Sequence, residues 1–265
     1  MNSNPDIHFE MQDTVAVVRL TRPTKRNALN DKLIASLRHI FENLPATAKA
    51  AVIAGDGDHF CAGLDLSDLQ ERDAGQGMHH SRSWHHALER VQYGPVPVVA
   101  ALHGAVVGGG LELASACHIR VADESTFYAL PEGTRGIFVG GGGSVRISRL
   151  VGTSRMTDMM LTGRVFDAAE GYTLGFSNYL VEPQQGLAKA HDLAVKIAAN
   201  APLSNYAITQ ALPRIADLSH SDGLFMESLI SSIAQGDEAA KERVRAFLEK
   251  RAGKVKKQET GSGAA

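Results

Sequence analysis

Two glutamates are the first candidates for chemistry in this chain, because each lies beside a run of glycines. Glu112 comes two residues after the run 108–110, at the start of an apolar, helix-like segment. Glu132 follows a strand-like segment and precedes a second run at 140–143. Two carboxyls in a dry cleft can divide acid and base roles, because burial and neighbours separate their pKa values. Taken alone, Glu112 is equally consistent with a charge that complements a helix dipole.

The runs of glycine themselves predict that backbone N–H groups take part in the chemistry. Glycines before a helix expose its first N–H groups, which lack an intrahelical partner and lie at the positive end of the dipole. Segments 59–65 and 105–114 each follow a predicted strand, and the second opens a helix. They indicate a site for an oxyanion or a phosphate, although the run at 108–110 alone more often marks a tight turn. No P-loop or dinucleotide fingerprint occurs there, which argues against ATP and NAD.

Composition predicts a soluble globular chain with a sizeable core. The 265 residues are 44% hydrophobic and 21% charged, typical of one large domain or a domain with a smaller appendage. No apolar run is long enough to cross a bilayer. The first residues lack the features of a secretory or transit signal, so the expected location is cytoplasmic. A formal charge of −2 gives no general attraction for nucleic acid, and none is expected as a partner.

Several other residue types have simpler interpretations. Cys61 and Cys117 are too few for a disulfide framework and are expected to be buried. Four histidines occur as two adjacent pairs without an intervening acid, which favours a solvated helix face over a metal site: His79, His80, His85 and His86. No metal is therefore expected. Trp84 and Tyr128 are predicted to pack rather than to react.

Alternating strands and helices predict a layered α/β fold for most of the chain. Strands are expected at 14–20, 50–54 and 96–102, with one or two more in 118–130. Helices are expected at 31–44 after an Asn30 cap, at 67–93, 111–117 and 144–152, and after an Asp167 cap.

From about residue 184 the pattern becomes almost entirely helical. Pro202 suits a helix start. Asp222 and Asp237 are predicted to cap two further helices, the second of which ends near residue 251. Segment 241–257 carries a local charge of +6 from eight basic and two acidic residues, which suits either a solvated helix or a contact with phosphate.

Longer motifs carry a family resemblance over residues 10–251. HFCAGLDL, HGAVVGGGLELASAC, FYALPEGTRGIFVGGGGS and MMLTGRVFDAAEGYTLGFSNYLVE occur in the same order as in the crotonase (enoyl-CoA hydratase/isomerase) superfamily, which the chain resembles. RPTKRNAL and AFLEKR are similar as well. The resemblance implies a spiral of stacked ββα units that forms an acyl-CoA-binding catalytic core over 1–199. A helical trimerisation region would follow over 200–251, with a disordered tail at 252–265.

By the same resemblance, the chain binds an acyl-CoA thioester and needs no separate cofactor, because coenzyme A is part of the substrate. The backbone N–H groups of Leu64 and Gly109 would stabilise an enolate oxygen. Glu112 and Glu132 would hold and activate water, helped by the N–H of Gly140. The residues expected to contact coenzyme A are Lys25, Arg26, Ala28, Ala62 and Asp65, with Phe247 and Lys250 reaching it from a neighbouring subunit of a homotrimer or hexamer.

The predicted activity is hydration of a trans-2-enoyl-CoA to 3-hydroxyacyl-CoA, since glutamate stands at both carboxylate positions. The alternatives are an enoyl-CoA isomerase, a hydroxycinnamoyl-CoA hydratase-lyase, and a catalytically idle scaffold or RNA-binding relative. Val139 replaces a proline usual in hydratases, and Arg135 and Phe138 also alter the pocket wall. These departures leave the chain length and aromatic preference of the acyl group open.

Overall fold

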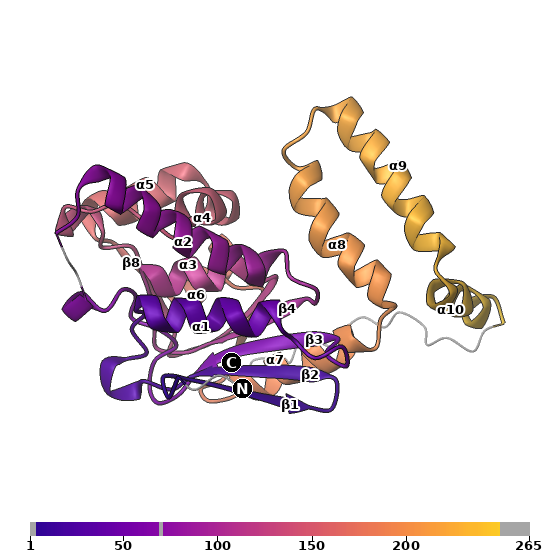
Figure 1. The fold of residues 1–265 in the computed structure, drawn as a ribbon, viewed down its shortest axis with the longest axis horizontal. Coiled ribbons are helices and arrows are strands. Elements are labelled where there is room, and N and C mark those ends of the chain that lie inside the picture. Colours follow the sequence, from indigo (N-terminus) through magenta and orange to yellow (C-terminus); the bar gives the residue numbers. More distant parts are fainter. Residues whose placement is uncertain (1–3, 69–70, 250–265) are drawn as a thin grey trace, which may run out of the picture. The chain divides into compact units, whose positions relative to one another are not determined.

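The computed structural model describes residues 4–68 and 71–249 (Figure 1). They fall into two compact units, the first ending at Asn200 and the second beginning at Ala201. This division lies one residue from the predicted boundary between 199 and 200. The expected tail at 252–265 lies outside the described residues.

The described strands and helices have the following bounds. The strands are β1 (Ile7–Gln12), β2 (Val15–Leu20), β3 (Ala50–Gly55), β4 (Val98–Leu102), β5 (Ala105–Val107), β6 (Ile119–Asp123), β7 (Phe127–Ala129), β8 (Val165–Asp167) and β9 (Tyr179–Val181). The helices of the first unit are α1 (Asp31–Glu42), α2 (Ala74–Gln92), α3 (Gly109–Ala116), α4 (Gly143–Val151), α5 (Thr153–Thr162), α6 (Ala168–Leu174) and α7 (Gly186–Ala198). Those of the second unit are α8 (Pro202–Ile215), α9 (His220–Gly236) and α10 (Glu238–Leu248).

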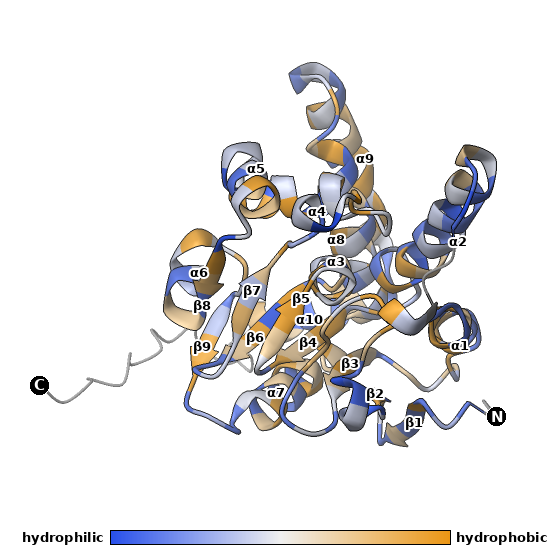
Figure 2. Ribbon diagram, turned by 90° about the vertical axis from the view of Figure 1, so that its left-hand side faces the viewer, coloured by the Kyte–Doolittle hydropathy of each residue, from blue (hydrophilic) through white to orange (hydrophobic). Residues whose placement is uncertain are grey.

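A six-stranded sheet in the order β1-β2-β3-β4-β6-β9 forms the first layer, and all its pairs except β1–β2 are parallel. Its strands are rich in valine, isoleucine and alanine, and both faces are covered. Val15 and Val17 pack with α7 on one face, whereas Ala16 and Val18 face the main core on the other. Figure 2 shows the hydrophobic colouring of β3 to β6 against the more hydrophilic α2.

A second layer forms where the chain leaves β2, β3, β4 and β6 of the large sheet. Strands β5, β7 and β8 make a small sheet, and isolated parallel bridges pair Cys61 with Val106 and Leu29 with Leu64. Successive turns of the chain therefore stack strand on strand and loop on loop. This stacking brings loops far apart in the sequence to the same side of the fold.

Helix caps explain most of the boundaries. Asn30 and Asp167 cap α1 and α6, as predicted. The side chain of Asn30 accepts the Leu33 N–H, and Asp167 forms a capping box with Glu170. Asp237 caps α10 as predicted.

Two predicted helix starts are wrong. Helix α9 is capped by Ser219, not Asp222, whose carboxylate lies in the first turn and accepts the Ser219 hydroxyl at 2.6 Å. Helix α2 begins at Ala74 rather than residue 67, because Asp73 forms a capping box with Gln76. None of the described helices is long and apolar enough to cross a membrane.

Candidate active site

The five predicted catalytic positions line one cavity in the first unit. It has a volume of about 350 Å³, and its walls come from the loop after β3, helix α2, the turn into α3 and the loop after β7. The five residues are Leu64, Gly109, Glu112, Glu132 and Gly140. The stacked loops of the second layer thus bring together positions that are 76 residues apart at the extremes.

Glu112 is held deep in this cavity by backbone donors. It lies in the first turn of α3 and is only 4% exposed. The N–H groups of Gly141 and Gly143 each donate to its Oε1 at 2.8 Å. Burial raises the pKa of Glu112, while these N–H groups, Arg146 and the N–H of Gly140 oppose the rise. The carboxylate form is therefore hydrogen-bonded although it is buried.

Glu132 shares the cavity but lacks such donors on one oxygen. It is 7% exposed, and its buried Oε2 has no hydrogen-bond partner within the described part of the chain. Burial raises the pKa of Glu132 to about 7, and the charge of Glu112 adds to the rise while Arg135 opposes it. Glu132 is thus a carboxyl group that keeps its proton close to neutral pH.

Two backbone N–H groups complete the cavity. Gly63 and Asp65 form the backbone hydrogen bonds with Leu29, so the N–H of Leu64, between them, faces away from that bridge. Gly109 is the first residue of α3. Neither its N–H nor the Leu64 N–H has a protein acceptor among the described residues. A Cβ built on Gly109 would lie 3.6 Å from the Leu64 nitrogen, so the two groups are close neighbours.

A glycine makes this approach possible. Gly63 has φ +94°, and a Cβ there would lie 2.8 Å from the carbonyl oxygen of Val107. Any other side chain would clash with the backbone that leads into α3. Gly63 therefore allows the N–H groups of Leu64 and Gly109 to face the same cavity.

The loop predicted to contact coenzyme A, which contains Lys25, Arg26 and Ala28, is ordered by the buried carboxylate of Asp65. Arg22 donates to Asp65 Oδ2 at 2.8 Å, and Ser67 donates its hydroxyl to Oδ1 at 2.6 Å. The contacts with Ser67 and Arg22 outweigh burial and lower the pKa of Asp65 to about 2. Lys25 is about half exposed, with its Nζ 4.0 Å from Asp65 Oδ1. The carboxylate of Asp65 thus binds protein groups in this structure.

Backbone contacts join this loop to the catalytic loop. The Ala62 N–H donates to the Arg26 carbonyl at 2.9 Å, and the Ala28 carbonyl accepts from Arg22 at 2.6 Å. Arg26 has φ +50°, where the chain turns back after a short 3-10 helix. The predicted residues from the two loops are therefore adjacent, while their contact with coenzyme A stays a prediction.

The last predicted residues belong to the second unit. Phe247 lies on α10 and is 71% exposed. Lys250 lies outside the described residues. The contact of both residues with coenzyme A on a neighbouring subunit stays a prediction.

The residues predicted to be structural are confirmed as packed. Trp84 and Tyr128 are buried; Tyr128 stacks on Phe176 at 4.9 Å between ring centroids. Both cysteines are buried and unpaired, with their pKa values raised to about 12 by burial. No group of histidine, cysteine or acidic residues within 4–68 and 71–249 is arranged to hold a metal ion.

Three hydrogen bonds around the site were not predicted from the sequence. Asp31 accepts hydrogen bonds from Trp84 at 2.9 Å and His80 at 2.8 Å. Ser81 on α2 donates to the carbonyl of Gly140 at 2.7 Å. A serine on a polar helix gives no local pattern that marks it, because its partner lies 59 residues further along the chain.

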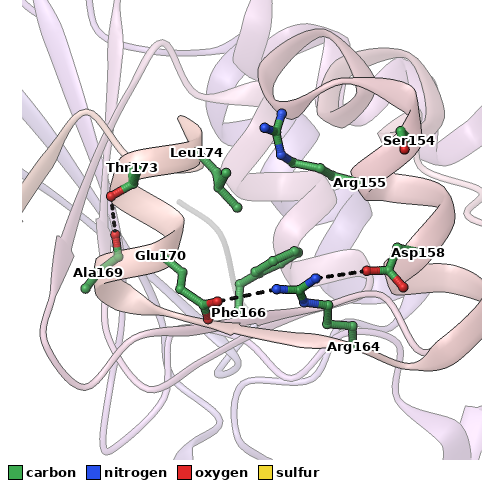
Figure 3. Close-up of a pocket in the computed structure, with 9 residues that line it drawn as sticks. All are labelled: Ser154, Arg155, Asp158, Arg164, Phe166, Ala169, Glu170, Thr173 and Leu174. Carbon is green, nitrogen blue, oxygen red and sulfur yellow. Dashed lines mark hydrogen bonds and ion pairs between the residues drawn. The ribbon is translucent and has the colours of Figure 1, made fainter.

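A second cavity, of about 590 Å³, lies between α5, β8 and α6 (Figure 3). Its central cation is already neutralised: Arg164 contacts Asp158 at 3.2 Å and Glu170 at 3.5 Å, and lies over the ring of Phe166. Arg155 donates to the carbonyl of Val151. Arg164 is therefore already paired with acidic groups, and the cavity holding Glu112 and Glu132 is the better candidate for chemistry.

Comparison with known proteins identifies the family of this chain. The family model for enoyl-CoA hydratase/isomerase matches residues 10–258. The chain belongs to this family, which binds acyl-CoA thioesters, and its α/β architecture is the crotonase fold.

Individual relatives support the same assignment. A crystal structure of a putative enoyl-CoA hydratase from Rhodopseudomonas palustris is 55% identical, has a TM-score of 0.91 and aligns over 95% of this chain and 98% of that one. A putative enoyl-CoA hydratase of Thermus thermophilus is 36% identical over 89% of this chain and 95% of its own length. The short-chain-enoyl-CoA hydratase of Clostridium acetobutylicum is 31% identical over 93% and 95%, respectively. These names indicate an enzyme of the enoyl-CoA hydratase/isomerase type.

Proposed function

We propose that this chain is an enoyl-CoA hydratase, which adds water across the 2,3 double bond of a trans-2-enoyl-CoA to give a 3-hydroxyacyl-CoA. The observation that carries the proposal is the pair of buried carboxyls, Glu112 and Glu132, in one cavity with two unpaired backbone N–H groups. Hydration needs two proton transfers and a site for developing negative charge, and these groups supply both.

The backbone groups suit the thioester oxygen. When water adds to the β-carbon, negative charge develops on that oxygen as an enolate. The N–H groups of Leu64 and Gly109 would donate to it without reorganising, which is the usual basis of an oxyanion hole.

The carboxyls divide the proton transfers by their surroundings. Glu112, with its backbone donors, would act as the carboxylate that takes a proton from water. Glu132 would donate its proton to the α-carbon. Its Oε1 would lie 2.8 Å from a Cβ built on Gly108, next to the Gly109 N–H, so it lies beside the thioester end of the site. Water adds as hydroxide at the β-carbon and a proton at the α-carbon, and the pair still holds one proton afterwards.

An isomerase remains the runner-up, because one base is enough to move a proton between the α- and γ-carbons. The second buried carboxyl favours hydration, because isomerisation would need only one of the two carboxyls. A hydratase-lyase would add the same water to an aryl-propenoyl thioester and then cleave the carbon chain. The cavity wall contains both apolar Phe138 and charged Arg135, so its residues do not select among these acyl groups.

The experiment that tests the proposal is incubation of the purified protein with crotonyl-, long-chain enoyl- and feruloyl-CoA, followed by mass analysis of the thioester products. A hydratase gives a product heavier by one water. An isomerase gives a product of unchanged mass, and a lyase gives acetyl-CoA with an aldehyde. Absence of any product, together with RNA binding that weakens with salt, would favour the non-catalytic alternative.

A further inference from the structure

The hydrogen bonds that hold Glu112 come from a backbone with little stiffness of its own. Gly141 and Gly143, which donate to Oε1, belong to a run of four glycines at 140–143. Because glycine has no Cβ, a peptide unit between two glycines meets little steric resistance when it rotates. Each unit that donates to Glu112 must therefore be fixed by a contact with its carbonyl.

Helix α4 fixes one of these units. The carbonyl of Gly142 accepts the N–H groups of Val145 and Arg146 at 3.3 and 3.2 Å, as part of the first turn. In a planar trans peptide the C=O and N–H point in opposite directions. The Gly143 N–H is thereby directed away from the helix and toward Glu112.

A side chain fixes the other unit. Ser81 donates its hydroxyl to the carbonyl of Gly140 at 2.7 Å, and the opposite end of that same peptide unit is the Gly141 N–H. One turn along α2, His85 Nε2 lies 3.3 Å from Ser81 Oγ. Because the Ser81 proton is used on Gly140, His85 must be the donor, which assigns its proton to Nε2.

We propose that Ser81 is a positioning residue for Glu112: its hydroxyl fixes the Gly140–Gly141 peptide unit so that the Gly141 N–H donates to the carboxylate, and His85 orients the hydroxyl. The proposal rests on the proposed role of Glu112 in activating water. Ser81 also lines the cavity, so α2 contributes to the geometry of the catalytic carboxylate as well as to the wall.

Loss of this contact has a defined electrostatic consequence. A carboxylate that accepts fewer N–H groups has a higher pKa. The other charged groups that act on Glu112 are Arg146 from α4 and Glu132 from the loop after β7, while His85 contacts Ser81. Replacement of Ser81 leaves the charges of Arg146 and Glu132 in place. Since Glu112 acts in its ionised form, the acid limb of the pH profile of kcat must move to higher pH.

The test compares Ser81→Ala with Ser81→Thr, which keeps a hydroxyl, and with Ser83→Ala. Ser83 is an exposed serine on the same helix that donates only to the carbonyl of His80, so it is a matched control. For Ser81→Ala we expect kcat to fall by about 10- to 100-fold, the range known for loss of hydrogen bonds that orient metal ligands, with KM little changed. The acid limb should move to higher pH. Ser81→Thr should restore most of kcat, and Ser83→Ala should match the wild type.

A readout independent of turnover separates this proposal from the proposed function. Carbon-13 NMR titration of the Glu112 carboxyl should show a higher pKa in Ser81→Ala than in Ser81→Thr. An unchanged titration, or a lower melting temperature with an unchanged pH profile, would overturn the positioning role. If the wild type hydrates no enoyl-CoA, the proposed function fails, whereas the titration still decides whether Ser81 holds the Glu112 site.

Discussion

Glu112 and Glu132 occupy the same cavity in different surroundings. This difference allows one carboxyl to act as a base and the other as an acid. Glu112 accepts backbone N–H groups, which favour its charged form against burial. Glu132 has an unpartnered buried oxygen and a pKa raised to about 7. The pair can therefore hold one proton near neutral pH and move it in a defined direction.

Glu112→Gln and Glu132→Gln should each lower the rate of hydration by about 10²–10⁴-fold, the usual contribution of a general acid or base. Affinity for coenzyme A should stay nearly unchanged, because the family resemblance places both side chains at the water rather than at the nucleotide. Steady-state kinetics and calorimetric titration with coenzyme A measure these two effects. Near-wild-type turnover by either variant would exclude the two-carboxyl mechanism.

The raised pKa of Glu132 also predicts a dependence on pH. A carboxyl whose pKa rises from 4.5 in the unfolded chain to about 7 in the folded one destabilises the fold increasingly between these values. Glu132→Gln should therefore be more stable than the wild type at pH 8, by at most about 3 kcal/mol, and no more stable at pH 4. Urea unfolding at the two pH values measures this difference, and a gain equal at both would show that ionisation is not its cause.

For the wild type, kcat should fall as pH rises above about 7, because Glu132 then loses the proton that it must donate. The pH profile of kcat on crotonyl-CoA checks this. A flat profile up to pH 9 would assign the α-proton to another donor.

At the scale of elements, the chemistry lies in loops that follow strands of both sheets. The loop containing Leu64 follows β3, and the turn containing Gly109 follows β5. Each loop is held by its neighbour in the stack, as the bridges of Cys61 with Val106 and Leu29 with Leu64 show. The rigid strands therefore set the distance between the two N–H groups.

Leu64→Pro removes one of these N–H groups, whereas Leu64→Ala keeps it. We expect Leu64→Pro to lower turnover by about 10²-fold or more, the typical cost of losing one preorganised donor. Leu64→Ala should change turnover only modestly, through packing. Melting temperature and coenzyme A affinity control for distortion of the loop, and a folded Leu64→Pro variant as active as Leu64→Ala would remove this N–H from the oxyanion hole.

Local patterns in the sequence predicted the elements that depend on local forces. The caps of Asn30 and Asp167 and the alternation of strand and helix are of this kind. Strand β1 and helix α5 were not predicted, because their stability comes from pairing and packing with distant segments. The same reason applies to Ser81, whose function depends on a carbonyl brought close only by the fold.

The catalytic positions themselves could be predicted only through the family resemblance. Glu112 and Glu132 alone allow a structural interpretation, and nothing in their local sequence shows that they share a cavity. The fold adds the backbone donors of Glu112 and the unpartnered oxygen of Glu132, which distinguish the two groups.

At the scale of the whole molecule, the second unit presents apolar side chains that a partner could cover. Phe225, Leu229 and Ile233 on α9 are exposed. The family resemblance implies a trimer or a dimer of trimers, with Phe247 and Lys250 contacting coenzyme A on a neighbouring subunit. The assembly and the contact between subunits are both expectations.

Lys250→Ala should mainly weaken binding of the coenzyme A thioester, with little effect on kcat at saturation, because it removes a charge from the predicted nucleotide contact. Light scattering should give a trimer or hexamer for both wild type and variant. A fully active monomer would contradict a site completed by a neighbouring subunit.

The most direct test of hydration is incubation of crotonyl-CoA in ¹⁸O-labelled water, with mass analysis of the intact thioester. The wild type should give 3-hydroxybutyryl-CoA that carries ¹⁸O on the acyl chain, and the double variant Glu112→Gln/Glu132→Gln should give almost none. An isomerised or unchanged thioester without ¹⁸O from the wild type, or equal incorporation by the double variant, would contradict water addition by this pair of carboxyls.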